Sequence, residues 1–139
     1  MRNDYIMKMI EQFARVLSKV IFYKELKSYS LAQDELNDGS KMLSGFSLEQ
    51  IKKLSVKDLS LVFSISTIEG RAKLFYTSKL LQEEAEVFEI EKKHEASSLS
   101  YVKSLEILEE LRKHLTSNDG IKKNHLDFEI RNIREKIIN

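Results

Sequence analysis

Residues 16–39 read VLSKVIFYKELKSYSLAQDELNDG, and residues 81–104 read LQEEAEVFEIEKKHEASSLSYVKS. When the two stretches are aligned at an offset of 65 positions, small or apolar residues occupy the same places in both. The matched pairs are Val16/Leu81, Val20/Ala85, Tyr23/Phe88, Ala32/Ser97, Leu36/Tyr101 and Gly39/Ser104. An internal duplication of this kind indicates a repeated structural unit. We therefore predict two helical hairpins, each with closely packed helices.

The composition is that of a helical protein. The 139 residues include no Pro and only four Gly, so the residues that end helices and supply tight turns are scarce. A chain of this length fits one domain with a core of its own. We predict a single all-α domain over residues 1–139, a helical-hairpin array or bundle of about six to seven helices.

Helix start signals and hydrophobic periodicity divide the chain into four parts. We expect a hairpin at residues 3–44, two short helices at 47–65, a second hairpin at 67–115 and a C-terminal capping helix at 120–138. Asn3 or Asp4 is the expected cap of the first helix, and Ser47 with Gln50 forms a capping box at the first short helix. The helix at 95–115 is expected to bury Leu99, Val102, Leu105, Leu108 and Leu115.

The first helix carries more apolar surface than one neighbour can cover. Its apolar stripe at helical spacing is Ile6, Met9, Ile10, Phe13, Leu17, Val20 and Ile21. Outside that stripe lie Tyr5, Val16, Phe22, Tyr23 and Leu26. Either this helix is central to the bundle, or a second copy of the protein covers part of it.

Gly39 is the residue on which the first copy depends. Asn37-Asp38-Gly39 is a strong turn signal when taken alone, but the duplication pairs Gly39 with Ser104 inside a helix. A residue without a side chain lets two helices approach, which offsets a cost of about 1 kcal/mol for Gly within a helix. We predict that both residues lie inside helices at equivalent crossings. The full set of small positions expected at helix crossings is Val20, Ala32, Gly39, Ala85, Ser97 and Ser104.

The duplicated pattern resembles the tetratricopeptide repeat, in which small residues let helix A and helix B of each hairpin pack together. Residues 16–39 supply one such pair and residues 81–104 the other, with Tyr29 where the repeat often has an aromatic residue. The sequence departs from the repeat at Val20 and Ala85, which replace a Gly, and the closing Pro is absent. A generic helical bundle is the alternative architecture.

In the tetratricopeptide repeat, helix A lines the groove that binds a partner, and the resemblance carries this role onto two sets of residues. The first set is Ala14, Leu17, Ile21, Lys24 and Glu25. The second set, the expected partner groove, is Lys79, Gln82, Glu86, Glu89 and Ile90. The first set is mostly apolar. Either the protein's own helices or a partner can cover such a surface. We therefore expect only the second set to form an open groove.

The N-terminus carries a second resemblance. The opening MRNDYIMKMIEQFARVL is similar to the start of a small uncharacterised bacterial family, typical of Gram-positive species, whose members have a repeat-like body. This resemblance covers the whole chain in outline. It implies a bacterial source and no particular activity.

The chain shows no catalytic constellation, so we predict that it is not an enzyme and has no cofactor. His94, His114 and His125 are not spaced as metal ligands. Glu91 and His94 make one Glu-x-x-His pair, whereas a di-metal carboxylate bundle needs two. The five Glu of residues 83–91 are expected to form a solvated helix face. No catalytic, cofactor-binding or metal-binding residue is therefore assigned.

Charge, Cys content and the N-terminus bear on location. The formal net charge of +1 gives no general attraction to nucleic acid. The absence of Cys fits a reducing interior. The N-terminus does not have the pattern of a signal peptide, and no stretch approaches a membrane span. We expect a cytoplasmic protein.

These observations favour a non-enzymatic protein–protein interaction module, which we expect to be a homodimer with no nucleic-acid or membrane partner. One alternative is weak nucleic-acid binding through basic residues near the C-terminus. These residues are Lys122, Lys123, Arg131, Arg134 and Lys136. The other alternative is a small-molecule or metal site within the bundle.

Overall fold

This computed structural model describes residues 2–138, with side chains described for residues 4–138. Seven α-helices, joined by short loops, lie within these residues. The helices are α1 (Arg2–Glu25), α2 (Tyr29–Ser44), α3 (Leu48–Lys53), α4 (Val56–Val62), α5 (Ile68–Ile90), α6 (His94–His114) and α7 (Lys123–Ile138). No strand is present in the described residues. The predicted all-α fold is therefore confirmed.

The helix start signals are correct for the middle of the chain and less so at its ends. The capping box of Ser47 and Gln50 forms as predicted. Asp4 lies within the first turn of α1 rather than at its cap, and the side chain of Asn3 is outside the described ones. The last helix begins at Lys123, because residues 117–122 form a loop.

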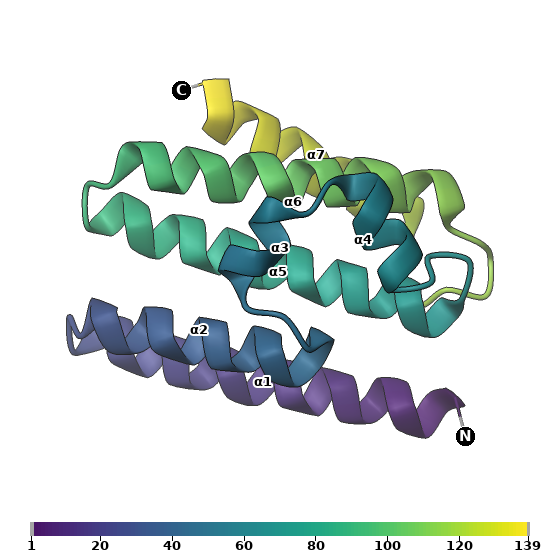
Figure 1. Ribbon diagram of the computed structural model, residues 1–139, viewed down its shortest axis with the longest axis horizontal. Coiled ribbons are helices and arrows are strands. Elements are labelled where there is room, and N and C mark those ends of the chain that lie inside the picture. Colours follow the sequence, from purple (N-terminus) through teal and green to yellow (C-terminus); the bar gives the residue numbers. More distant parts are fainter. Residues whose placement is uncertain (1, 139) are drawn as a thin grey trace.

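The helices form two antiparallel hairpins that pack side by side (Figure 1). α1 pairs with α2, α5 pairs with α6, and both helices of the first hairpin contact α5. α7 packs along α6. The short helices α3 and α4 lie in front of α5 and α6 in Figure 1, where they contact α2, α5 and α6. α1 lies partly behind α2, and α7 lies partly behind α6 (Figure 1).

The two hairpins share the geometry of their turns. Lys27 and Lys92 have positive φ angles of 59° and 62°. The next residues, Ser28 and Lys93, have ψ angles of 67° and 71° at the same φ of −93°. In both turns the backbone N–H of that next residue donates to the carbonyl five positions earlier, at 2.8 Å. The duplication therefore includes the connecting turn, which closes each first helix with a left-handed residue.

Gly39 lies inside α2 and is buried, as the duplication predicts. A Cβ atom on Gly39 would come 2.7 Å from Cγ2 of Val16 on α1, so a side chain has no room there. Ser104 occupies the matched place in α6, where its hydroxyl oxygen lies 2.7 Å from that of Ser78 on α5. Each residue thus stands where the two helices of its hairpin meet. The other small positions, Val20, Ala32, Ala85 and Ser97, are buried as well.

α6 faces α5 with its serines rather than with its leucines. Ser97, Ser100 and Ser104 are buried, whereas Leu99 is 61% exposed and Val102 is also exposed. The prediction that Leu99 and Val102 are buried is wrong. Small side chains permit a closer approach to α5, and this approach decides which face of α6 turns inward. Of the other residues expected to be buried, Leu108 and Leu115 are buried and Leu105 is half-buried.

A buried ion pair attaches α3 to the second hairpin. Lys52 Nζ lies 2.7 Å from Glu84 Oε1, and Ser100 Oγ donates a hydrogen bond of 2.7 Å to the same oxygen. Glu84 is almost fully buried, so the expectation that every Glu of residues 83–91 is solvated is wrong at this position. A buried carboxylate needs a partner, and the short helix α3 provides one.

Candidate interaction surface

α1 carries a second apolar stripe that the other helices leave largely exposed. Its members follow one another at alternating intervals of three and four residues and are Met7, Ile10, Ala14, Leu17 and Ile21. Met7 is 54% exposed, Ile10 is 37% exposed and Ile21 is 46% exposed. Ala14 is also exposed, and Leu17 is half-buried. This spacing is that of the contact positions in a coiled coil. We call these five residues the α1 stripe.

The inward side of α1 has a different set of residues. Met9, Val16 and Val20 are buried in the core that α1 shares with α2 and α5. The single stripe expected from the sequence is therefore divided, since Ile10 and Ile21 are exposed whereas Met9 and Val20 are buried. The fold buries only one of the two apolar faces of α1, and the other face is left largely exposed.

The two predicted groove sets lie on adjacent flanks of α1 and α5. Lys24 Nζ of the first set lies 3.5 Å from Glu86 Oε2 of the second set, which joins the two flanks. The prediction that only the second set is open is not supported, because Ala14, Ile21 and Glu25 are exposed. In the second set, Ile90 is exposed and the other four residues, Lys79, Gln82, Glu86 and Glu89, are half-buried. Lys79 pairs with Glu129 of α7.

A concave apolar pocket adjoins the α1 stripe near the N-terminal end of α5. It has a volume of about 430 Å³ and is lined by residues of α1, α5 and the loop before α7. The apolar lining residues are Ile6, Ile10, Ile68, Ala72, Phe75 and Ile121. Lys122 and His125 also line the pocket and are exposed. Because Ile10 belongs both to the pocket and to the α1 stripe, the two features form one continuous apolar surface.

An internal ion pair holds the loop that forms one wall of this pocket. Arg71 Nε donates to both carboxylate oxygens of Asp119, at 3.0 and 3.1 Å, and Arg71 Nη1 donates to the Ile65 carbonyl at 3.0 Å. Thr116 donates to Asp119 from its backbone and its hydroxyl. Burial alone would raise the pKa of Asp119, but the hydrogen bonds from Arg71 and Thr116 outweigh it and lower that pKa. The loop is therefore fixed to the start of α5.

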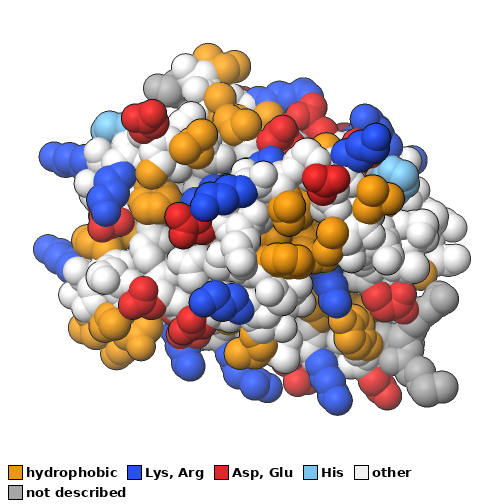
Figure 2. Space-filling view, in the orientation of Figure 1, with side chains coloured by type: hydrophobic (Ala, Val, Ile, Leu, Met, Phe, Trp, Pro, Cys, Tyr) orange, Lys and Arg blue, Asp and Glu red, His pale blue; other side chains and the backbone are white. Residues whose placement is uncertain are grey.

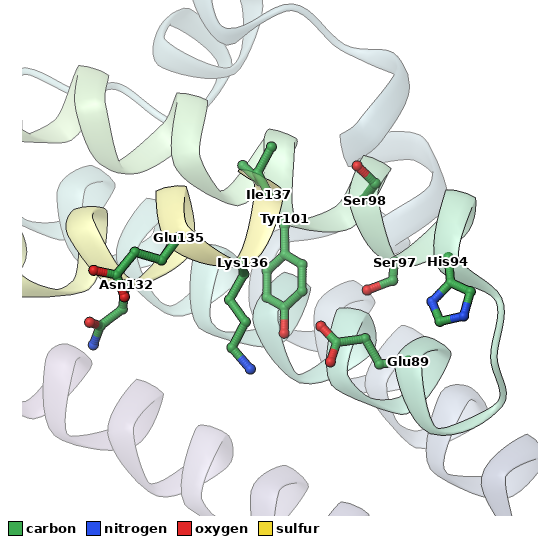
Figure 3. Close-up of a pocket in the computed structure, with 9 residues that line it drawn as sticks. All are labelled: Glu89, His94, Ser97, Ser98, Tyr101, Asn132, Glu135, Lys136 and Ile137. Carbon is green, nitrogen blue, oxygen red and sulfur yellow. The ribbon is translucent and has the colours of Figure 1, made fainter. Parts of the chain in front are cut away.

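A second concavity lies between the end of α7 and the α5–α6 hairpin (Figure 3). It has a volume of about 930 Å³. Glu89 of α5, Tyr101 of α6, and Glu135 and Lys136 of α7 are among its lining residues. Tyr101 lies in the middle of the group, with its hydroxyl directed toward the Glu89 carboxylate (Figure 3). We call this concavity the acidic pocket.

The histidines do not form a metal site. Within the described residues, no group of three or more His, Cys, Asp and Glu side chains has the geometry to hold a metal ion. His125 Nε2 lies 3.1 Å from Glu129 Oε2, and His114 Nε2 lies 3.5 Å from Glu110 Oε1. The three histidines are all exposed, and two of them lie next to a carboxylate of their own helix.

The basic residues near the C-terminus are partly neutralised. Arg134 pairs with Glu109 at 2.7 Å, and Asp127 of α7 pairs with Arg112. Figure 2 shows Lys and Arg side chains interspersed with Asp and Glu over the face in view, with hydrophobic side chains exposed between them. That face offers no extended basic patch of the kind that binds phosphates.

Comparison with known protein families, with curated proteins and with solved structures gives no significant match to this chain. The resemblances to the tetratricopeptide repeat and to a bacterial family therefore stay predictions. No described helix has the length and apolar character needed to cross a membrane. The cytoplasmic location also stays a prediction.

Two parts of this surface were not foreseen from the sequence. The Arg71–Asp119 ion pair joins residues 48 positions apart, and its only local signal is an isolated Arg among the buried residues of α5. Tyr101 was placed correctly in the duplicated pattern, but its hydroxyl and the nearby Glu89 carboxylate come from two different helices. Only the tertiary arrangement brings them together.

Proposed function

We propose that this protein is a non-enzymatic interaction module, built from two tetratricopeptide-like hairpins, that pairs with a second copy of itself through the α1 stripe. The observation that carries the proposal is the exposure of Met7, Ile10 and Ile21 along one face of α1, at coiled-coil spacing. Apolar side chains arranged in one exposed stripe mark an interaction site more strongly than scattered ones do.

A second copy fits the stripe because α1 is an edge helix with a long apolar face. Its 24 residues span roughly 36 Å at 1.5 Å per residue, which is long enough for a helix-to-helix interface. The apolar pocket beside Ile10 widens the surface toward α5. Ala14, in the middle of the stripe, lets the backbones of two α1 helices approach closely.

Sedimentation equilibrium over a range of protein concentrations tests this proposal. Ile10→Lys and Ile21→Lys each place a charge in the interface of both copies, so each is expected to weaken dimerisation at least tenfold, about 1.4 kcal/mol. Met42→Lys is the matched control, because Met42 is 63% exposed on α2, away from the stripe. Circular dichroism checks that all variants keep their helices.

The outcome is decided by the wild-type chain and the control together. A dimer for the wild type and for Met42→Lys, with monomers for the two stripe variants, supports the proposal. A wild-type chain that stays monomeric at all concentrations overturns the dimer. Equal weakening by all three substitutions overturns the assignment to α1.

A further inference from the structure

The acidic pocket contains a buried polar group that the fold does not satisfy. Tyr101 is only 4% exposed, and its hydroxyl has no hydrogen-bond partner among the described residues. Buried hydroxyls are nearly always paired, because an unpaired one loses its bonds to water without replacement. Its removal as Tyr101→Phe is therefore expected to leave the fold intact.

Three carboxylates follow one another along one face of α5, and one of them, Glu89, lines the pocket beside this hydroxyl. Burial is the largest cause of the raised pKa of Tyr101, the Glu89 side chain toward which its hydroxyl points is the next, and the charges of Glu86 and Glu83 raise it further. The pKa of Glu83 is raised as well, first by burial and then by Glu86. Glu83, Glu86 and Glu89 follow one another at intervals of three residues along α5, so neighbouring carboxylates repel each other. The charged residues that line the pocket are two Glu and one Lys, so acidic side chains are in excess beside a neutral phenol.

The protein compensates this charge only in part. Glu86 is paired with Lys24 at 3.5 Å, and Lys79 is already bonded to Glu129. Glu83 and Glu89 have no ion pair among the described residues. Lys136 borders the pocket from α7 and is exposed (Figure 3).

We propose that the acidic pocket binds an alkylammonium group, which donates to the Glu89 carboxylate and to the Tyr101 hydroxyl oxygen. Both groups accept hydrogen bonds, and an ammonium group is a donor with a complementary charge. A volume of about 930 Å³ admits an aliphatic chain behind the charged head. The ammonium comes either from a free diamine or from a Lys side chain of a partner protein.

This site is separate from the proposed dimer interface. The lining of the acidic pocket comes from α5, α6 and α7, whereas the α1 stripe belongs to α1. The monomeric variant Ile10→Lys is therefore expected to bind an ammonium ligand as the wild type does. Failure of the dimer and failure of this site are distinguishable for that reason.

The test is an NMR titration of the ¹⁵N-labelled protein with cadaverine and, separately, with N-acetyl-lysine methylamide. Pentane-1,5-diol, which has the same length and no charge, is the ligand control. We expect both amines to shift amide signals around residues 89–101 and 132–137. Binding of both identifies the ammonium group as the ligand, and binding of cadaverine alone restricts the site to free diamines.

Substitutions separate a specific site from general attraction between charges. Glu89→Gln is expected to weaken cadaverine binding about tenfold and Tyr101→Phe about threefold. Removing the neighbouring cation with Lys136→Gln is expected to strengthen it about threefold. The control is Glu95→Gln, which removes an exposed carboxylate outside the pocket lining. The proposal is overturned if neither amine shifts the signals, if the diol shifts them equally, or if Glu89→Gln and Tyr101→Phe behave as Glu95→Gln does.

Discussion

Lys27 and Lys92 adopt the same left-handed backbone conformation at matched positions of the two hairpins. This conformation costs a residue with a side chain roughly 1–2 kcal/mol, and glycine usually occupies it. The residues around them differ, with Leu26 and Ser28 in the first turn and Glu91 and Lys93 in the second. The same turn thus closes both hairpins despite different neighbouring side chains.

Glycine at these two turns is expected to stabilise the protein. Lys27→Gly and Lys92→Gly each relieve the left-handed strain and lose part of that gain to the greater freedom of the unfolded chain, for a net gain of about 0.5–1 kcal/mol. Urea denaturation measures the change. Lys8→Gly, within α1, is the control and is expected to cost about 1 kcal/mol. Destabilisation at all three positions would contradict the assigned turn geometry.

Gly39→Ala tests the close approach of α1 and α2. Alanine is the better helix former by about 1 kcal/mol, but its Cβ would meet Val16 at 2.7 Å. We expect the clash to prevail and to destabilise the protein by a net 1–3 kcal/mol or so. Thermal and urea unfolding measure the effect.

The matched rescue is Val16→Ala in the Gly39→Ala background. Shortening Val16 removes the two methyl groups nearest to the new Cβ, so the double variant is expected to be more stable than the sum of the single changes by about 1 kcal/mol or more. Strict additivity of the two changes would show that these residues do not meet.

Asp119→Ala is expected to destabilise the protein strongly at neutral pH. It leaves the guanidinium of Arg71, whose side chain is 5% exposed, without its charged partner, and such a loss costs about 3–5 kcal/mol. Urea denaturation at pH 7 measures the effect. The control is the exposed Asp38 of α2, and Asp38→Ala is expected to change stability by less than about 0.5 kcal/mol.

The same ion pair predicts a loss of stability in acid. The pKa of Asp119 is lowered in the folded state, so its ionised form stabilises the fold above the unfolded-state pKa of about 3.9. That contribution is lost as the pH falls below this value toward the lowered pKa. The stability difference between wild type and Asp119→Asn should therefore shrink as the pH is lowered below about 4. A difference that stays constant would argue against an ionised Asp119.

Patterns that depend on nearby residues were predicted well from the sequence. The helices, the two hairpins, the capping box at Ser47 and the helical Gly39 all follow from spacing along one segment or from the duplication. The inward face of α6 was predicted incorrectly, with Leu99 buried, because a helix with two candidate faces is oriented by its neighbours rather than by its own periodicity. Glu84 was wrongly predicted to be solvated for the same reason, because its partner Lys52 lies on another helix.

The surface for a partner was predicted only in part. The excess of apolar residues on the first helix was evident, but the division into a buried stripe and an exposed stripe was not. Met9 and Ile10 are both members of the single stripe that the sequence predicts. Only the position of α2 and α5 shows that Met9 is covered and Ile10 is not.

Cysteine cross-linking tests the central claim, the pairing of two copies through the α1 stripe, most directly. The chain has no Cys, so Ala14→Cys introduces a single thiol in the middle of the stripe, and Ser98→Cys introduces one on the exposed surface of α6. A disulfide forms readily only between residues whose Cα atoms come within about 7 Å of each other. If two copies pair through the α1 stripe, mild oxidation converts Ala14→Cys to a covalent dimer much faster than Ser98→Cys. Equal rates for the two variants, or no cross-link at Ala14→Cys, would contradict this pairing.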